Sequence, residues 1–238
     1  EQRTVDYLIE QFTAAGLQPG AADGSWVQAV PLVRARVDGQ VTATLHMGDT
    51  HRALVNGEDL TVQSLQPREH VQLDQAPLVF VGYGIDAPER GWNDYKDLDL
   101  RGKIALVLIN DADFESAQPG AFDGRAVTYH GRWTYKYEEA ARRGAAGVLI
   151  VHETAAAAYP WATVQASGTS PLFDIQRGHE QGMATHTPMR GWLQRGLAEQ
   201  LFAAAGLDFE QAKRAAMQPD FQPVLLEDAR LSVDFSVI

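Results

Sequence analysis

The sequence contains no cysteine among its 238 residues. This absence excludes disulfide frameworks, thiolate zinc sites and cysteine nucleophiles. Long apolar runs are missing as well, because the longest strictly apolar stretch, residues 145–151, is far shorter than the roughly 18 residues that span a bilayer. We therefore expect no transmembrane helix.

Positive charge is also scarce. The chain has 20 Lys and Arg residues against 31 Asp and Glu residues, which gives a formal net charge of -11. The densest basic pair, Arg142-Arg143, follows Glu138-Glu139 on one predicted helix and is explained by i,i+4 pairing in solvent. Because binding to a phosphate backbone requires local basic charge, we expect no nucleic acid partner.

Recognisable catalytic motifs are absent too. The seven histidines form neither an H-E-x-x-H motif nor an H-x-D triplet, the spacings that bring metal ligands together. His152-Glu153 lacks a second histidine at position 156, and His179-Glu180 has Met183 in the corresponding place. We therefore assign no catalytic residue, no metal ligand and no cofactor to this chain, and we expect no tightly bound zinc.

The first pattern that is present is helical. Val5, Leu8, Ile9 and Phe12 recur at the i, i+3, i+4, i+7 spacing of one apolar helix face. Gly16 then ends the pattern as a C-cap glycine. We predict a helix over residues 5–15 with a single apolar stripe.

Strands are expected next. Apolar residues alternate from Trp26 to Leu45, and Asp38-Gly39 between two such runs predicts a hairpin turn. Further short strand-like runs are Arg52–Val55, His70–Leu73 and Pro77–Val81.

Two later runs, 103–109 and 145–151, are continuous and apolar apart from the initial Lys103, as expected of strands buried on both faces. Between them, residues 131–144 predict a helix that ends at a glycine, so we expect a strand–helix–strand unit whose two strands share a sheet. One side of this helix carries charged residues that we place in solvent, namely Lys136, Glu139 and Arg143.

The C-terminal third predicts two helices and a strand. Thr187-Pro188 is a typical helix start, so we expect a helix that carries Trp192 on its apolar face and continues to Gly206. Asp208 begins a second, shorter helix, and residues 231–237 alternate like a half-buried strand. The whole pattern predicts a mixed α/β fold.

Several segments resemble one known family in order and spacing: Ala76–Ile85, Trp92–Lys96, Asp99–Leu108, and Gly131–Ala140 leading into Gly144–Leu149. They are similar to the protease-associated (PA) domain inserted in bacterial di-zinc aminopeptidases of the glutamate carboxypeptidase-like family. The resemblance implies a PA domain over residues 36–238, with a β-rich core, a sandwich or open barrel, and flanking helices. Residues 1–35 are then a helix–strand arm of the peptidase catalytic domain.

The same resemblance implies a function. The parent is expected to be a zinc-dependent aminopeptidase whose two zinc ions are held by residues beyond Ile238. This segment is then a lid or specificity wall over the zinc site and has no peptidase activity alone. Its partners are a peptide substrate and the absent catalytic domain. An exported location, periplasmic or secreted, is also implied, although no signal segment opens this chain.

Aromatic and cationic residues are the candidates for contact with a peptide, because they match apolar side chains and carboxylates. We select six residues, at low specificity, as the substrate-binding lid: Tyr129, Arg132, Trp133, Tyr135, Tyr159 and Trp161. The alternative is structural: Trp133 packs the helix on its sheet, Arg132 caps or pairs locally, and residues 159–161 pack a loop.

A second reading of the whole chain is a free-standing interaction module that binds peptides or carbohydrates. The helix over residues 5–15 discriminates between the two readings. In a peptidase fragment its apolar stripe faces the missing domain, so we expect it to be detached or to mediate self-association. In a self-contained module the stripe lies in the core of this chain.

Overall fold

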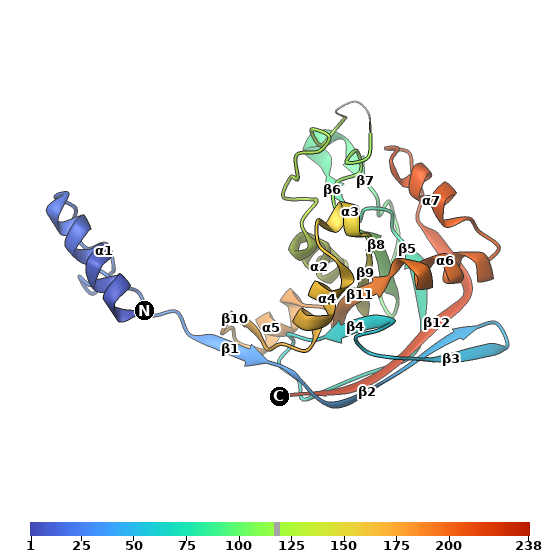
Figure 1. Cartoon of the computed structure of the whole chain (residues 1–238), viewed down its shortest axis with the longest axis horizontal. Helices are drawn as coiled ribbons and strands as arrows, with labels where there is room; N and C mark the ends of the chain where they lie inside the picture. Colours follow the sequence, from blue (N-terminus) through green and yellow to red (C-terminus); the bar gives the residue numbers. More distant parts are fainter. Residues whose placement is uncertain (117–119) are drawn as a thin grey trace.

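A computed structural model describes residues 1–116 and 120–238. The fold is mixed α/β, and its centre is an eight-stranded sheet that curls into a half-barrel (Figure 1). This shape agrees with the open-barrel alternative expected from the sequence. Seven α-helices occur in the described residues, and they are α1 (Gln2–Ala14), α2 (Trp133–Arg142), α3 (Thr154–Ala157), α4 (Trp161–Gly168), α5 (His179–Thr185), α6 (Arg195–Ala204) and α7 (Phe209–Ala216).

The large sheet has an antiparallel part and a parallel part. Its strands, in spatial order, are β3 (Thr50–Leu54), β2 (Val37–Met47), β12 (Val224–Val237), β5 (His70–Phe80), β8 (Ile104–Leu108), β9 (Gly147–His152), β11 (Met189–Gln194) and β4 (Leu60–Gln63). The first four pair antiparallel, β5, β8, β9 and β11 pair parallel, and β4 closes the far edge antiparallel to β11.

Two small sheets complete the strand inventory. One joins β1 (Leu32–Ala35) to β10 (Leu172–Ile175), and the other joins β6 (Asp86–Ala87) to β7 (Trp92–Asn93) around a short 3-10 turn, η1 (Pro88–Arg90). The single strand predicted over His70–Leu73 and the one predicted over Pro77–Val81 are one continuous strand, β5.

The predicted strand–helix–strand unit is confirmed. β8 and β9 pair in parallel from Ile104 with Gly147 to Leu108 with Val151. Every residue of both strands is buried, because helices cover both faces of the sheet. Alternate side chains enter two separate cores: one lies under α6 and α7, and the other lies under α2, α3 and α4.

The expectation that the charged side of α2 faces solvent is wrong for two residues. Lys136 is fully buried and donates a hydrogen bond to the Asn110 carbonyl oxygen over 2.9 Å. Glu139 is buried and accepts from Arg142 and Arg143. Burial lowers the pKa of Lys136 to about 7, against the pull of nearby carboxylates. The segment that follows β8, which carries Asn110, lies against this side of the helix, and period-3.6 patterning does not reveal it.

The predicted hairpin at Asp38-Gly39 is also wrong. Both residues lie inside the long strand β2, and Gly39 has a φ of 71°. The register with β12 shifts at this point, because Asp234 pairs with Thr42 whereas Ser236 pairs with Asp38. The positive φ therefore serves a β-bulge, and not a turn. The actual turn between β2 and β3 lies at residues 48–49.

The helix predicted to begin at Thr187-Pro188 begins later in the structure, so this prediction is wrong for residues 189–194. Residues 189–194 form strand β11, and the helix begins only at Arg195. Pairing with β9 on one side and β4 on the other overrides the local start signal. The second predicted helix is confirmed as α7, whose N-cap Asp208 accepts from the Gln211 amide over 2.6 Å.

Helix α1 projects away from the rest of the molecule (Figure 1). It ends at Gly16 as expected: the Gly16 amide bonds to the Thr13 carbonyl and the Leu17 amide to the Phe12 carbonyl. None of its residues is buried. Phe12 stacks on Trp26 of the following loop, with ring centres 6.3 Å apart. The apolar stripe of this arm is therefore open along most of its length.

Candidate functional site

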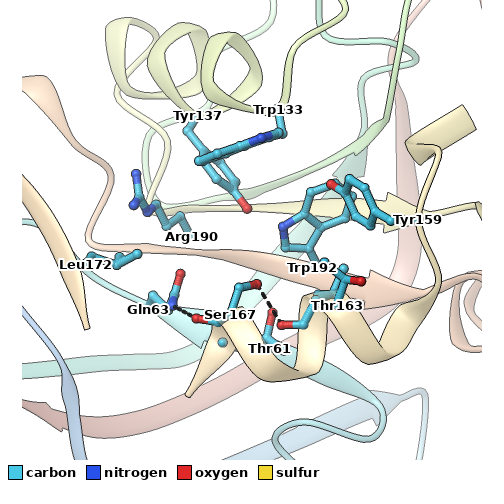
Figure 2. A pocket seen from close by; sticks show the side chains of 12 residues that line it. Thr61, Gln63, Trp133, Tyr137, Tyr159, Thr163, Ser167, Leu172, Arg190 and Trp192 are labelled. Carbon is cyan, nitrogen blue, oxygen red and sulfur yellow. Dashed lines mark hydrogen bonds between the residues drawn. The ribbon is translucent and has the colours of Figure 1, made fainter. Parts of the chain in front are cut away.

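A hollow lies at the β11–β4 edge of the sheet, under α2 and beside α4 (Figure 2). We call it the aromatic cleft, and it encloses about 230 Å³. Its lining residues come from β4, α2, α4, β10, β11 and the loop before α4: Thr61, Gln63, Trp133, Tyr137, Tyr159, Thr163, Val164, Ser167, Gly168, Leu172, Arg190 and Trp192.

Glycine and backbone hydrogen bonds set the floor of the cleft. A Cβ on Gly191 would stand 1.8 Å from the Thr61 carbonyl oxygen, so only glycine lets β4 approach β11 this closely. A Cβ on Gly168 would meet Thr61 at 2.7 Å. The Gln63 amide nitrogen donates to the Ser167 carbonyl over 2.9 Å. The end of α4 is thereby fixed against the edge strand.

Aromatic rings form two walls. Trp133 packs edge-on against Tyr137 on α2, with ring centres 5.8 Å apart, and Tyr159 packs edge-on against Trp192, at 6.1 Å. The Tyr137 hydroxyl donates to the Gly191 carbonyl over 3.1 Å, and burial raises the pKa of Tyr137. Trp133, by contrast, remains 42% exposed. The cleft is therefore a fixed apolar slot with one accessible indole at its mouth.

Arg190 is the charged residue of the cleft. It is 9% exposed, and its guanidinium carbon lies 5.0 Å from the centre of the Tyr137 ring. Its Nε is enclosed and has no hydrogen-bond partner among the described residues. Burial lowers the pKa of Arg190, partly opposed by Tyr137 and Asp174. A buried guanidinium of this kind usually has a carboxylate partner.

Two further hollows adjoin the cleft, and Trp133 borders all three. The first, which we call the basic hollow, encloses about 550 Å³ and shares Tyr137 and Arg190 with the cleft. The second encloses about 470 Å³ and is lined by Arg132, Tyr159 and the α3 region. Trp133 is therefore the residue that the three hollows share.

The six residues predicted for substrate contact are only partly brought together. Trp133 and Tyr159 line the aromatic cleft, and Arg132 lines the neighbouring hollow. Trp133 is 42% exposed, and its ring packs edge-on against Tyr137 of the same helix.

The other three predicted residues lie outside the cleft. Tyr135 is buried and exchanges hydrogen bonds of 3.0 Å with the backbone of Asp86. The Tyr129 hydroxyl donates to Glu138. The Trp161 indole donates to the Gly57 carbonyl over 2.9 Å, which agrees with the loop-packing alternative for that residue.

Sequence reasoning missed most of the cleft. Trp192 is predicted to lie on a helix, and neither Tyr137 nor Arg190 is predicted as a site residue. The signal that was available is Gly191 between an arginine and a tryptophan: a glycine there, within an apolar run, indicates close backbone approach.

Among residues 1–116 and 120–238, no three His, Asp or Glu side chains lie close enough together to hold a metal ion. In the same residues, no helix is both long and apolar enough to cross a membrane.

Comparison with known proteins identifies the central part of the chain. The PA domain family model matches residues 74–182, which include β8, α2, β9 and α4. The curled eight-stranded sheet of the chain and its flanking helices are consistent with a PA domain. None of the curated proteins matches the chain significantly.

Among solved structures, the chain is similar to the aminopeptidase from Aneurinibacillus sp. strain AM-1. The identity is 17% and the TM-score is 0.37, over 99% of this chain and 38% of that chain. This chain therefore spans well under half the length of that enzyme.

Proposed function

We propose that this chain is the non-catalytic portion of a zinc-dependent aminopeptidase and selects peptide substrates for it as a lid. The catalytic residues and both zinc ions would be supplied by sequence beyond Ile238, and the enzyme would be exported, as the resemblance in sequence implies. The observation that carries the proposal is the aromatic cleft in a PA domain, with Trp133 exposed at its mouth.

The geometry of the predicted 36–238 unit supports its role as an insert. The Arg36 amide donates to the Ile238 carbonyl over 2.8 Å, and the Ile238 amide donates to the Arg36 carbonyl over 2.9 Å. Arg36 and Ile238, at the two ends of the predicted unit, are thus hydrogen-bonded to each other. A unit with adjacent ends can interrupt another domain without separating the strands or helices of its host.

The detached arm supports the peptidase reading over the free-standing module. The apolar stripe of α1 includes Leu8 and Phe12, which are both exposed, and no residue of the helix enters the core of this chain. Exposed apolar surface of this kind commonly marks a contact site for another protein surface. We assign the catalytic domain as that partner.

The cleft is tested by titrating the 238-residue chain with the peptides Ala-Ala-Leu and Ala-Ala-Gly. We expect the leucine peptide to bind more tightly, because its side chain enters the aromatic slot. Trp133→Ala should weaken binding of Ala-Ala-Leu at least about tenfold, the effect of removing a central tryptophan.

The matched control is Tyr7→Ala, which removes an exposed aromatic residue from α1 and leaves the cleft intact. In the longer enzyme, Trp133→Ala should raise KM for leucine peptides more than it lowers kcat. Equal affinity for both peptides, together with unchanged binding in Trp133→Ala, would show that the cleft does not select peptides.

A further inference from the structure

Arg190 lacks the carboxylate partner that a buried guanidinium usually has. No carboxylate of the described residues pairs with it, and the Tyr137 ring is its main contact. Asp174 is the carboxylate whose charge acts on Arg190. It already pairs with Arg177 over 2.5 Å and with His186 over 2.6 Å. A buried cation without an anion is an incomplete arrangement.

The surface beside Arg190 is locally cationic in an otherwise acidic chain. The basic hollow is lined by Arg142, Arg177 and Arg190, against Glu138 and Asp174. Its fourth basic residue, His186, has its pKa lowered by burial. Hydrogen bonds to His186 and Arg177 hold the pKa of Asp174 below its ordinary value, although burial alone would raise it. In a chain with a net charge of -11, this excess of arginines makes the hollow more favourable for an anion than the average surface.

We propose that the aromatic cleft binds a carboxylate placed next to an apolar side chain. Arg190 holds the carboxylate, and Trp133, Tyr159 and Trp192 receive the apolar group (Figure 2). The two halves of the site adjoin: Arg190 and Leu172 lie on one side of the slot, and Tyr159 and Trp192 on the other. The inference rests on the proposed function, because it names the peptide chemistry that the lid would select.

Two parts of a peptide carry a carboxylate. One is the C-terminal carboxylate, and the other is the side chain of Asp or Glu. A guanidinium binds both in the same way, through charge-assisted hydrogen bonds. The experiment therefore uses three peptides: Ala-Ala-Leu as the free acid, Ala-Ala-Leu with an amidated C-terminus, and Ala-Glu-Leu with an amidated C-terminus.

The measurement is isothermal titration of the 238-residue chain with each peptide. We expect the amide of Ala-Ala-Leu to bind about ten- to hundredfold more weakly than a carboxylate form, the usual effect of losing a hydrogen bond to a charged group. Tight binding of the free acid alone identifies the C-terminal carboxylate as the natural group. Tight binding of the Ala-Glu-Leu amide identifies an acidic side chain.

Two variants separate ligand binding from folding. Arg190→Met should abolish the preference for a carboxylate while the Leu-against-Gly preference is kept, because the aromatic walls remain. Arg190→Lys should recover part of the preference, since it restores the charge without the planar fork. The control is Arg101→Gln, whose side chain is exposed and pairs with Asp99 away from the cleft; it should leave all affinities unchanged.

The failures are distinguishable. If the acid and the amide bind equally to the native chain and Arg190→Met changes neither, the carboxylate assignment is overturned while the apolar selection stands. If no peptide binds and Trp133→Ala has no effect on KM in the longer enzyme, the proposed function itself fails. If Arg190→Met does not fold, the acid-to-amide ratio of the native chain alone decides the assignment.

Discussion

A buried cation on one side of the sheet is paired with carboxylates, whereas a buried cation on the other side is not. On the α7 side, Lys213 is 4% exposed and pairs with two carboxylates, Glu115 at 2.7 Å and Glu153 at 2.8 Å. Arg195 pairs with the same Glu153 over 2.8 Å. On the α2 side, Arg190 is nearly as buried and pairs with no carboxylate of the described residues.

This difference separates a structural cation from one kept for a ligand. Where charges are paired within the chain, removal of one partner leaves the other buried and uncompensated. Where a charge is unpaired, its removal eliminates a desolvation cost. The free energy of unfolding should therefore respond with opposite signs on the two sides, and the predictions below follow that contrast.

The largest effect is expected for Lys213→Met. The substitution leaves buried Glu153 with Arg195 as its only remaining cation. We expect a loss of about 3 kcal/mol in the free energy of unfolding, the cost of breaking a buried pair from one side. Urea denaturation at neutral pH measures it. Arg101→Met, on an exposed pair, is the reference and should change stability by less than about 0.5 kcal/mol. Equal losses in the two variants would contradict a structural role for Lys213.

An intermediate effect of the opposite sign is expected for Arg190→Met. The thioether retains the apolar stem and the contact with Tyr137, and the desolvated charge is removed. We expect the free energy of unfolding to be unchanged or to rise by about 1 kcal/mol. The same urea titration applies. A loss as large as that of Lys213→Met would place Arg190 among the structural cations and remove the contrast between the two sides.

The smallest effect on stability is expected in the arm. The double variant Leu8→Ser, Phe12→Ser changes side chains that no described core residue covers. The free energy of unfolding of the remaining body should change by less than about 0.5 kcal/mol. Self-association should decrease instead, as measured by sedimentation equilibrium. If stability drops by several kcal/mol and the mass in solution is constant, the helix belongs to the core of this chain.

The sequence predicted those parts of the fold in which one local rule acts alone. Continuous apolar runs identified β8 and β9, and a C-cap glycine marked the end of α1. The prediction was wrong where a distant segment decides the outcome. Gly39 supports a bulge only because β12 pairs there, and residues 189–194 are a strand only because β9 and β4 flank them.

The candidate site was less predictable than the fold, because its residues come from separate parts of the chain. Trp133 and Tyr159 could be selected as aromatic residues near helix starts and loops. Arg190 has no such signal, since its importance depends on what is missing around it. Lack of a carboxylate within reach is a property of the assembled structure and cannot be found from a sequence pattern.

The position of β12 has a consequence for how the molecule forms. This last strand lies between β2 and β5, and its Ser232 contacts His46 across 186 residues of chain. During synthesis β2 and β5 therefore emerge long before the strand that joins them. Contacts between residues far apart in the sequence slow folding, and strands are prone to aggregate before they are paired. We expect the half-barrel to close as a late and slow step, after the parallel strands and their helices have formed.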